Sequence, residues 1–125
     1  MTSDAIILVV EDDPILKNLL GHTFVNQYHM VYASNGAEGL SLMEENQPSL
    51  ILLDLMMPDM DGFTFLEKAR SRTDAMKDVP IIVISNLGQQ KDIDRAKSLG
   101  ANDYLVKANV SVDEIVAKIK QTLEE

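Results

Sequence analysis

Two hydrophobic patterns alternate along the chain. Short, almost continuous runs of Ile, Leu and Val are typical of parallel strands that are buried on both faces. They cover residues 6–10, 30–33, 50–53, 81–84 and 104–106. Each run is followed by a segment in which apolar residues recur every three or four positions, a spacing that predicts a helix with one buried face. These positions are Ile15, Leu19, Leu20 and Phe24, then Ala37, Leu40 and Met43, then Phe63, Leu66 and Ala69, then Ile93, Ala96 and Leu99, and finally Val112, Ile115, Ile119 and Leu123.

Five strands that alternate with five helices predict an α/β domain with a doubly wound parallel sheet. The run 30–33 is the least continuous of the five, so we place it at an edge of the sheet, which suits the strand order 2-1-3-4-5. In such a sheet, ligands bind beyond the carboxyl ends of the strands, where the first and third strands are neighbours. Local residues agree with the helix bounds, because Asp13 and Pro14 are typical of a helix start and Gly100 of a helix end.

Length and composition restrict the class of protein. The 125 residues fit one domain, residues 1–125, and 46% of them are hydrophobic, as in globular chains. A net charge of −9 argues against direct binding to nucleic acid or to an anionic membrane surface. The chain has no cysteine, no apolar run long enough to span a bilayer, and no basic flank before its first apolar run. We expect a cytoplasmic protein, monomeric or weakly dimeric, with no output domain in this chain.

Charged and polar side chains follow the buried runs, at what should be the carboxyl edge of the sheet. Glu11 and Asp12 end the first run, Asp54 the third, Ser85 the fourth and Lys107 the fifth. Carboxylates that converge on one place repel each other unless a cation lies between them. A hard divalent ion with few protein ligands and several retained waters fits this arrangement, which indicates Mg²⁺. The alternative, that Glu11 and Asp12 are only solvated beside a helix cap, becomes less favourable once Asp54 is placed next to them.

Asp54 is the candidate reacting group. A lone carboxylate at a strand end is commonly a loop cap, but this one lies where ligands bind, beside other acids, with Ser85 and Lys107 approaching. A carboxylate can attack phosphorus to form an aspartyl phosphate when the phosphoryl charge is neutralised. Mg²⁺ and Lys107 would supply that positive charge, and the Ser85 hydroxyl could donate a hydrogen bond to a phosphoryl oxygen.

Four sequence strings, ILVVEDDP, LILLDLMMPDMDG, PIIVIS and GANDYLVK, follow one another over nearly the whole chain. Together they resemble the receiver domain of two-component response regulators, and the resemblance implies the flavodoxin-like (βα)5 fold of the CheY-like superfamily. It also implies that Asp54 accepts a phosphoryl group from a sensor histidine kinase, a phosphotransfer protein or a small phosphodonor. Glu11 and Asp12 match the acidic pair that holds Mg²⁺, for which Mn²⁺ is expected to substitute, and the backbone carbonyl of Met56 matches a further ligand.

The same resemblance implies a conformational switch. Ser85 matches the hydroxyl residue that reports phosphorylation, Lys107 matches the lysine that pairs with the phosphoryl group, and Tyr104 matches the aromatic residue that turns inward. In the family these changes alter the surface formed by the helix near residues 93–99, the strand 104–106 and the last helix. We therefore expect an unknown downstream protein to bind there.

Three side chains near Asp54 are candidates for setting the lifetime of the phosphate. Water attacks an aspartyl phosphate in line, so Met56 and Leu87, which are bulky and hold water poorly, should shield phosphorus and give a long-lived phosphorylated state. Asn86, where receiver domains usually have a small residue, could orient a water instead. Ala108 also departs from the family pattern, because it stands where a proline is usual, and the peptide bond before it is expected to be trans.

Three other functions compete with a phosphoaccepting switch. A pseudo-receiver that binds partners without being phosphorylated is the main alternative, and the complete set of site residues counts against it. A flavodoxin-like cofactor binder would need a Gly/Ser/Thr-rich phosphate cradle after the first strand, where this chain has three acids. A phosphatase with an aspartate nucleophile would need a second acid two residues after Asp54, where the chain has Met56. A signalling switch that is not an enzyme in its own right accounts for the residues best.

Overall fold

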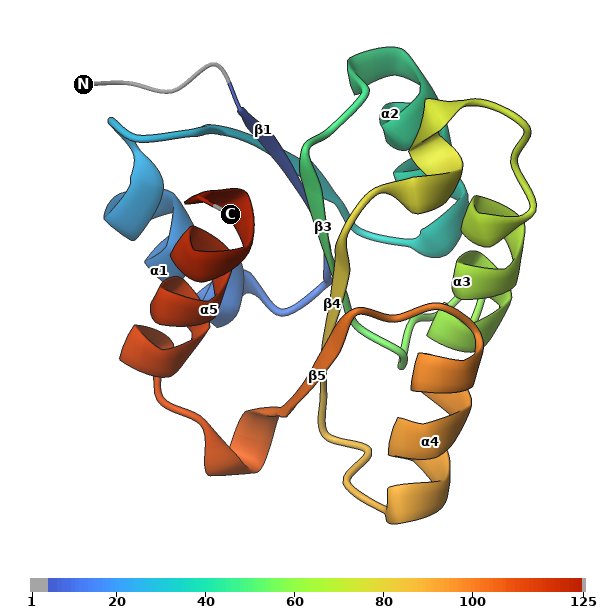
Figure 1. Cartoon of the computed structure of the whole chain (residues 1–125). Helices are drawn as coiled ribbons and strands as arrows, with labels where there is room; N and C mark the ends of the chain where they lie inside the picture. Colours follow the sequence, from blue (N-terminus) through green and yellow to red (C-terminus); the bar gives the residue numbers. More distant parts are fainter. Residues whose placement is uncertain (1–4, 125) are drawn as a thin grey trace.

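The computed structural model describes residues 5–124. A parallel sheet with the strand order β2-β1-β3-β4-β5 forms its centre (Figure 1). The strands are β1 (Ile6–Val10), β2 (His29–Ala33), β3 (Leu50–Leu53), β4 (Ile81–Ser85) and β5 (Asp103–Val106). The helices are α1 (Pro14–Phe24), α2 (Gly36–Asn46), α3 (Gly62–Arg70), α4 (Gln90–Ser98) and α5 (Val112–Glu124), with the short 3-10 helices η1 (Ala75–Asp78) and η2 (Lys107–Asn109). The predicted fold class, the strand order and the edge position of β2 are confirmed.

Helices cover both faces of the sheet. One face carries α1 and α5, and the other carries α2, α3 and α4 (Figure 1). Successive residues of a strand point to opposite faces, so each strand contributes side chains to both layers. In β1, Ile7 and Val9 pack in the core with α1 and α5, whereas Leu8 and Val10 pack in the core with α2 and α3. This burial on two sides explains why the strands are continuous in apolar residues rather than alternating.

The strand register brings the polar residues at the strand ends to one level. Val10 pairs with Leu53 at the ends of β1 and β3. The backbone extends this alignment by one step, because the N–H of Asp54 donates to the carbonyl of Val10 at 3.0 Å. On the other side of the site, Ser85 at the end of β4 pairs with Val106, the last residue of β5. The carboxyl edge of the sheet is therefore where the predicted site residues leave the strands.

The helix ends predicted from local residues are confirmed. Asp13 is the N-cap of α1, and its carboxylate accepts a hydrogen bond from the N–H of Ile15 at 3.0 Å, with Pro14 as the first helical residue. Gly100 follows the end of α4 with φ +111°, a conformation that favours glycine. No helix in the described part of the chain is long and apolar enough to cross a membrane.

Arg70, at the end of α3, joins several segments at the opposite, amino-terminal edge of β4 and β5. Its guanidinium donates to the carbonyls of Lys77 at 2.8 Å, Val79 at 2.7 Å and Gly100 at 2.7 Å. It also donates to Oδ1 of Asn102 at 2.9 Å. One side chain thus satisfies backbone carbonyls from the segments that lead into both strands.

The helix α4 is held by few contacts. Ala96 is its one buried residue, whereas α3, of the same length, has five. Gln89 at its N-cap makes no side-chain capping hydrogen bond. The guanidinium carbon of Arg95 lies 4.1 Å from the centre of the Phe63 ring, a cation–π contact that joins α4 to α3.

Candidate functional site

Three carboxylates meet at the carboxyl edge of the sheet. Glu11, Asp12 and Asp54 each offer one oxygen atom, and these atoms all lie within 4.8 Å of one another. Glu11 and Asp54 are 2% and 5% exposed, whereas Asp12 is open to solvent. The acidic cluster expected from the sequence is therefore present, with two buried members and one exposed member.

Lys107 enters the cluster from the end of β5. Its Nζ atom lies 3.0 Å from the carboxylate of Glu11 and 3.3 Å from Oδ2 of Asp54. The approach to Asp54 was expected from the sequence, but the closer contact with Glu11 was not. The lysine offsets the repulsion between the two buried carboxylates. The sequence argument gave this role to a metal ion alone.

Burial is the largest influence on the ionisation of Glu11. It raises the pKa of this carboxyl from 4.5 to about 7, the hydrogen bond from Lys107 opposes the rise, and the charge of Asp54 adds to it. Burial alone would lower the pKa of Lys107, because it disfavours the charged ammonium group. The hydrogen bond with Glu11 and the charges of both carboxylates outweigh burial and raise the pKa of Lys107 above its ordinary value. Near neutral pH, Glu11 therefore exchanges a proton while Lys107 stays charged.

Backbone groups fix the orientation of the two buried carboxylates. The N–H of Met56 donates to Oδ1 of Asp54 at 3.1 Å, and the N–H of Asp13 donates to Oε1 of Glu11 at 3.0 Å. The cluster offers only carboxylate oxygens, and its solvent side at Asp12 leaves room for water ligands. Hard oxygen donors of this number and an open side are what Mg²⁺ prefers, so the residues present fit that ion.

Ser85 and Tyr104 lie on the neighbouring strands β4 and β5 and share a partner. Ser85 is completely buried, and its hydroxyl accepts a hydrogen bond from the N–H of Leu87 at 3.3 Å. The hydroxyl of Tyr104 donates to the carbonyl of Leu87. The tyrosine is only 9% exposed and packs in the core, and burial raises the pKa of its hydroxyl.

The three residues expected to tune phosphate lifetime differ in exposure. Met56 is 55% exposed, Leu87 is half-buried and Asn86 is exposed. Met56 and Leu87 line one hollow of about 710 Å³ together with Asp12. The bulky side chains thus flank the open side of the acidic cluster. The described residues contain no cis peptide bond, which confirms the expectation for Ala108.

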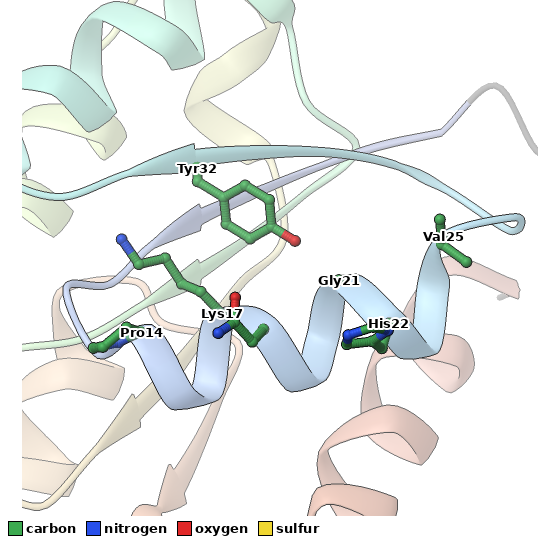
Figure 2. A pocket seen from close by; sticks show the side chains of 7 residues that line it. Pro14, Lys17, Gly21, His22, Val25 and Tyr32 are labelled. Carbon is green, nitrogen blue, oxygen red and sulfur yellow. The ribbon is translucent and has the colours of Figure 1, made fainter.

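A separate hollow of about 590 Å³ lies between α1 and β2 (Figure 2). Its lining includes Lys17, Gly21 and His22 from α1 and Tyr32 from β2, whose ring spans the space above the helix. The lining contains no carboxylate, unlike the cluster at the strand ends. We therefore take the carboxyl edge of the sheet, and not this hollow, as the site of chemistry.

Comparison with family models matches residues 7–120 to the response regulator receiver domain. The chain belongs to this family. Receiver domains are the signalling domains of two-component systems: they act as phosphorylation switches, bind a divalent metal at an acidic pocket, and interact with histidine kinases and downstream effectors.

Relatives of this receiver domain include transcriptional regulators. The DNA-binding dual master transcriptional regulator RpaA of Synechocystis sp. is 36% identical over 118 residues, which cover 94% of this chain and 48% of RpaA. The phosphorylated cyanobacterial phytochrome response regulator RcpA has a TM-score of 0.86 at 27% identity, covering 98% of this chain and 96% of RcpA. The Mn²⁺-bound form of response regulator Rcp1 has a TM-score of 0.81 at 25% identity, covering 94% and 92% of the two chains. The receiver domain spans about half the length of the curated relatives it matches.

One residue near the site was missed in the sequence. Asp59 lies in the loop between β3 and α3, and its carboxylate accepts hydrogen bonds from the N–H groups of Gly36 and Ala37. These partners lie 23 and 22 residues earlier in the chain, so no local pattern predicts the contact. One signal in the sequence is that Asp61 already caps α3, so that Asp59 has no neighbouring helix start to cap and is free to cap a distant one.

Proposed function

We propose that the domain is a phosphorylation-activated switch in which Asp54 accepts a phosphoryl group from a sensor histidine kinase, a phosphotransfer protein or a small phosphodonor. The observation that carries the proposal is the contact of Lys107 with the buried carboxylate of Asp54, beside Glu11 and Asp12. Phosphoryl transfer to a carboxylate needs a nucleophile, a nearby positive charge and ligands for a metal ion. Asp54, Lys107 and the pair Glu11 and Asp12 supply these three in one cluster.

In the proposed reaction, a carboxylate oxygen of Asp54 attacks phosphorus. The new O–P bond forms as the bond from phosphorus to the histidine nitrogen of the donor breaks, and that electron pair stays on the imidazole. Lys107, 3.3 Å from Asp54, faces the charge of the phosphoryl oxygens, and the hydroxyl of Ser85 donates to one of them. The N–H of Met56 holds the other carboxylate oxygen in place.

We further propose that Glu11, Asp12, Asp54 and the backbone carbonyl of Met56 hold Mg²⁺, with Mn²⁺ as a substitute. The ion supplies positive charge toward the phosphoryl oxygens when it is bound. The donor set supports this assignment because every side-chain ligand is a carboxylate and because Asp12 lies on the solvent side. The pseudo-receiver alternative, a domain that binds partners without phosphorylation, would have no need for this arrangement.

Phosphorylation with acetyl phosphate, followed on a phosphate-affinity gel, tests the proposal. The wild type should be modified in Mg²⁺ and not in EDTA, and Asp54→Asn should abolish the modification. Asp113→Asn, at an exposed position in the first turn of α5, is the matched control and should be modified like the wild type. Modification that survives Asp54→Asn, or that proceeds equally in EDTA, would contradict the assignment.

The protein donor is proposed to dock on α1 beside the site. Ile15 and Leu19 are apolar yet 71% and 42% exposed, and they line one hollow with Lys107 and Val110. Ile15→Lys should slow phosphotransfer from a protein donor and leave the reaction with acetyl phosphate unchanged. Val25→Lys, at a 69% exposed position just beyond the far end of α1, should leave both reactions unchanged. Equal effects of the two substitutions would argue against docking at this place.

The output is proposed to run through Ser85 and Tyr104 to the surface formed by α4, β5 and α5. The support is the shared partner Leu87, at the start of the loop that leads into α4, whose N–H and carbonyl contact Ser85 and Tyr104 respectively. Beryllofluoride, a phosphoryl mimic, should shift the NMR amide signals of α4 and β5 in the wild type. Ser85→Ala should reduce these shifts, and shifts confined to the loops around Asp54 would contradict the switch.

We propose that the downstream partner is a protein, because the net charge of −9 argues against direct contact of this domain with nucleic acid. We propose residues 1–125 as one receiver domain that is monomeric or weakly dimeric. The cytoplasm is its proposed location, because histidine kinases take their phosphoryl groups from ATP and the receiver must meet the kinase where ATP is present.

A further inference from the structure

The loop between β3 and α3 is tied to a helix that precedes it in the chain. Oδ1 of Asp59 accepts from the N–H of Gly36 at 2.9 Å, and Oδ2 accepts from the N–H of Ala37 at 3.0 Å. Both donors belong to the first turn of α2, where backbone N–H groups have no partner within the helix. The carboxylate therefore caps α2 from outside, and these two hydrogen bonds lower the pKa of Asp59.

The cap completes a helix start that local residues leave unfinished. Asn35 accepts a hydrogen bond from the N–H of Glu38 at 2.8 Å, and Glu38 accepts one from the N–H of Ser34 at 2.7 Å. These local bonds leave the N–H groups of the first two helical positions to Asp59. A carboxylate at this end also interacts favourably with the helix dipole. The loop is thus held at the start of α2, where both oxygens of the Asp59 carboxylate accept hydrogen bonds and its negative charge faces the positive end of the helix dipole.

A packing contact holds the next loop residue against the same helix. A Cβ atom built on Gly36 would lie 2.8 Å from Cβ of Met60, so only glycine lets Met60 approach this closely. Gly36 is buried and Met60 packs against the main core. The attachment therefore has a polar part at Asp59 and an apolar part at Met60.

The other end of the loop contacts the acidic cluster. The N–H of Met56 donates to Asp54, and the carbonyl of Leu55 accepts from the N–H of Gly62 at 2.9 Å. Only two residues lie between Met56 and Asp59, so a shift of the α2 attachment changes where the Met56 backbone lies. We infer that Asp59 is a positioning residue that holds the Met56 backbone in place for Asp54 and the metal site, an inference that rests on the proposed function.

A titration with MgCl₂, followed through backbone amide signals by NMR, tests the inference. Asp59→Ala should weaken Mg²⁺ binding about tenfold, the lower end of the roughly tenfold to hundredfold loss that follows removal of a group that orients a metal ligand. Asp59→Asn, which keeps one good acceptor oxygen, should give a smaller loss. Asn35→Ala is the matched control, because it removes a cap from the same helix end without touching the loop. It should lower the melting temperature and leave the Mg²⁺ affinity within about twofold of wild type.

A second readout needs no metal. In EDTA, Asp59→Ala should shift the amide signals of Met56 and Leu55, whereas Asn35→Ala should shift only those of α2. Mg²⁺ affinities that are equal in Asp59→Ala and Asn35→Ala would overturn the inference and leave the proposed function standing. A wild type that does not bind Mg²⁺ would overturn both.

Discussion

Replacing Glu11 with glutamine should remove a pH-dependent loss of stability from the metal-free protein. Burial raises the pKa of Glu11 to about 7 in the folded state, against 4.5 for the ordinary group. Below about pH 4.5 the carboxyl is protonated in both the folded and the unfolded chain, so it costs nothing. Between these two values the folded chain keeps a proton that the unfolded chain has released, so rising pH favours unfolding. Above about pH 7 the loss is complete.

The size of this effect follows from the same two values. Each pKa unit corresponds to 1.36 kcal/mol, so the folded wild type should lose about 3 kcal/mol of unfolding free energy between pH 4.5 and pH 7. Glutamine has no proton to lose and can still contact Lys107. The difference in unfolding free energy, Glu11→Gln minus wild type, should therefore rise by about 3 kcal/mol over this interval. Mg²⁺ should bind the wild type more tightly as the proton leaves, because the ligand must be ionised.

Urea unfolding in EDTA, followed by circular dichroism at pH values from 4.5 to 8, measures this difference. The comparison between variants cancels the contribution of carboxyls such as Asp103, whose pKa is lowered by its partner Lys118 against the effect of burial. Glu45→Gln, at an exposed position of α2, is the control and should run parallel to the wild type at all pH values. If the curve of Glu11→Gln also runs parallel to the wild type, the buried carboxyl is not held at a raised pKa.

Three further outcomes are expected. Gly62→Ala should destabilise the domain far more than Gly88→Ala, because the new Cβ would lie 2.6 Å from Cα of Leu55 in the first case and in ordinary contact in the second; thermal unfolding measures both. Arg70→Met should cost about 2–4 kcal/mol of unfolding free energy in urea titrations, since it leaves carbonyls near β4 and β5 without a donor, and an unchanged midpoint would show that water replaces the guanidinium. Met56→Asn should speed loss of the phosphate about tenfold, a change of only 1.4 kcal/mol in barrier, because an amide can hold the attacking water; decay in Mg²⁺ without a phosphatase measures it, and an unchanged lifetime would contradict shielding by Met56.

The fold could be predicted because its signals are local. Continuous apolar runs mark strands buried on two sides, and the alternation of runs with helical spacing leaves few topologies. The cap of α1 was predictable for the same reason, since Asp13 accepts from Ile15 two residues later. The acidic cluster followed from topology, because the carboxyl ends of neighbouring parallel strands meet at one edge. Small differences occur at the strand starts, where β2 begins at His29 and β5 at Asp103, one residue before the apolar run.

Contacts between distant residues could not be predicted where the strand topology does not impose them. Lys107 contacts Glu11 across 96 residues, and the cap by Asp59 spans 23. Their partners include backbone N–H groups, which every residue type except proline provides and which therefore leave no trace in the sequence. Arg70 is the clearest case, because three of its acceptors are backbone carbonyls. Its sequence position at a helix end gave no reason to expect more than a solvated cation.

The weak attachment of α4 has a consequence for how such a domain can change over evolutionary time. Because Ala96 is the one buried residue of α4, most side chains of this helix do not pack in the core. Substitutions at exposed positions away from caps and cores usually alter stability by less than about 0.5 kcal/mol. The residues that a downstream protein would read on α4 can therefore be exchanged one after another without unfolding the domain. The acidic edge, where Glu11 and Asp54 are buried against Lys107, has no such freedom, so new partners can be acquired while the chemistry stays fixed.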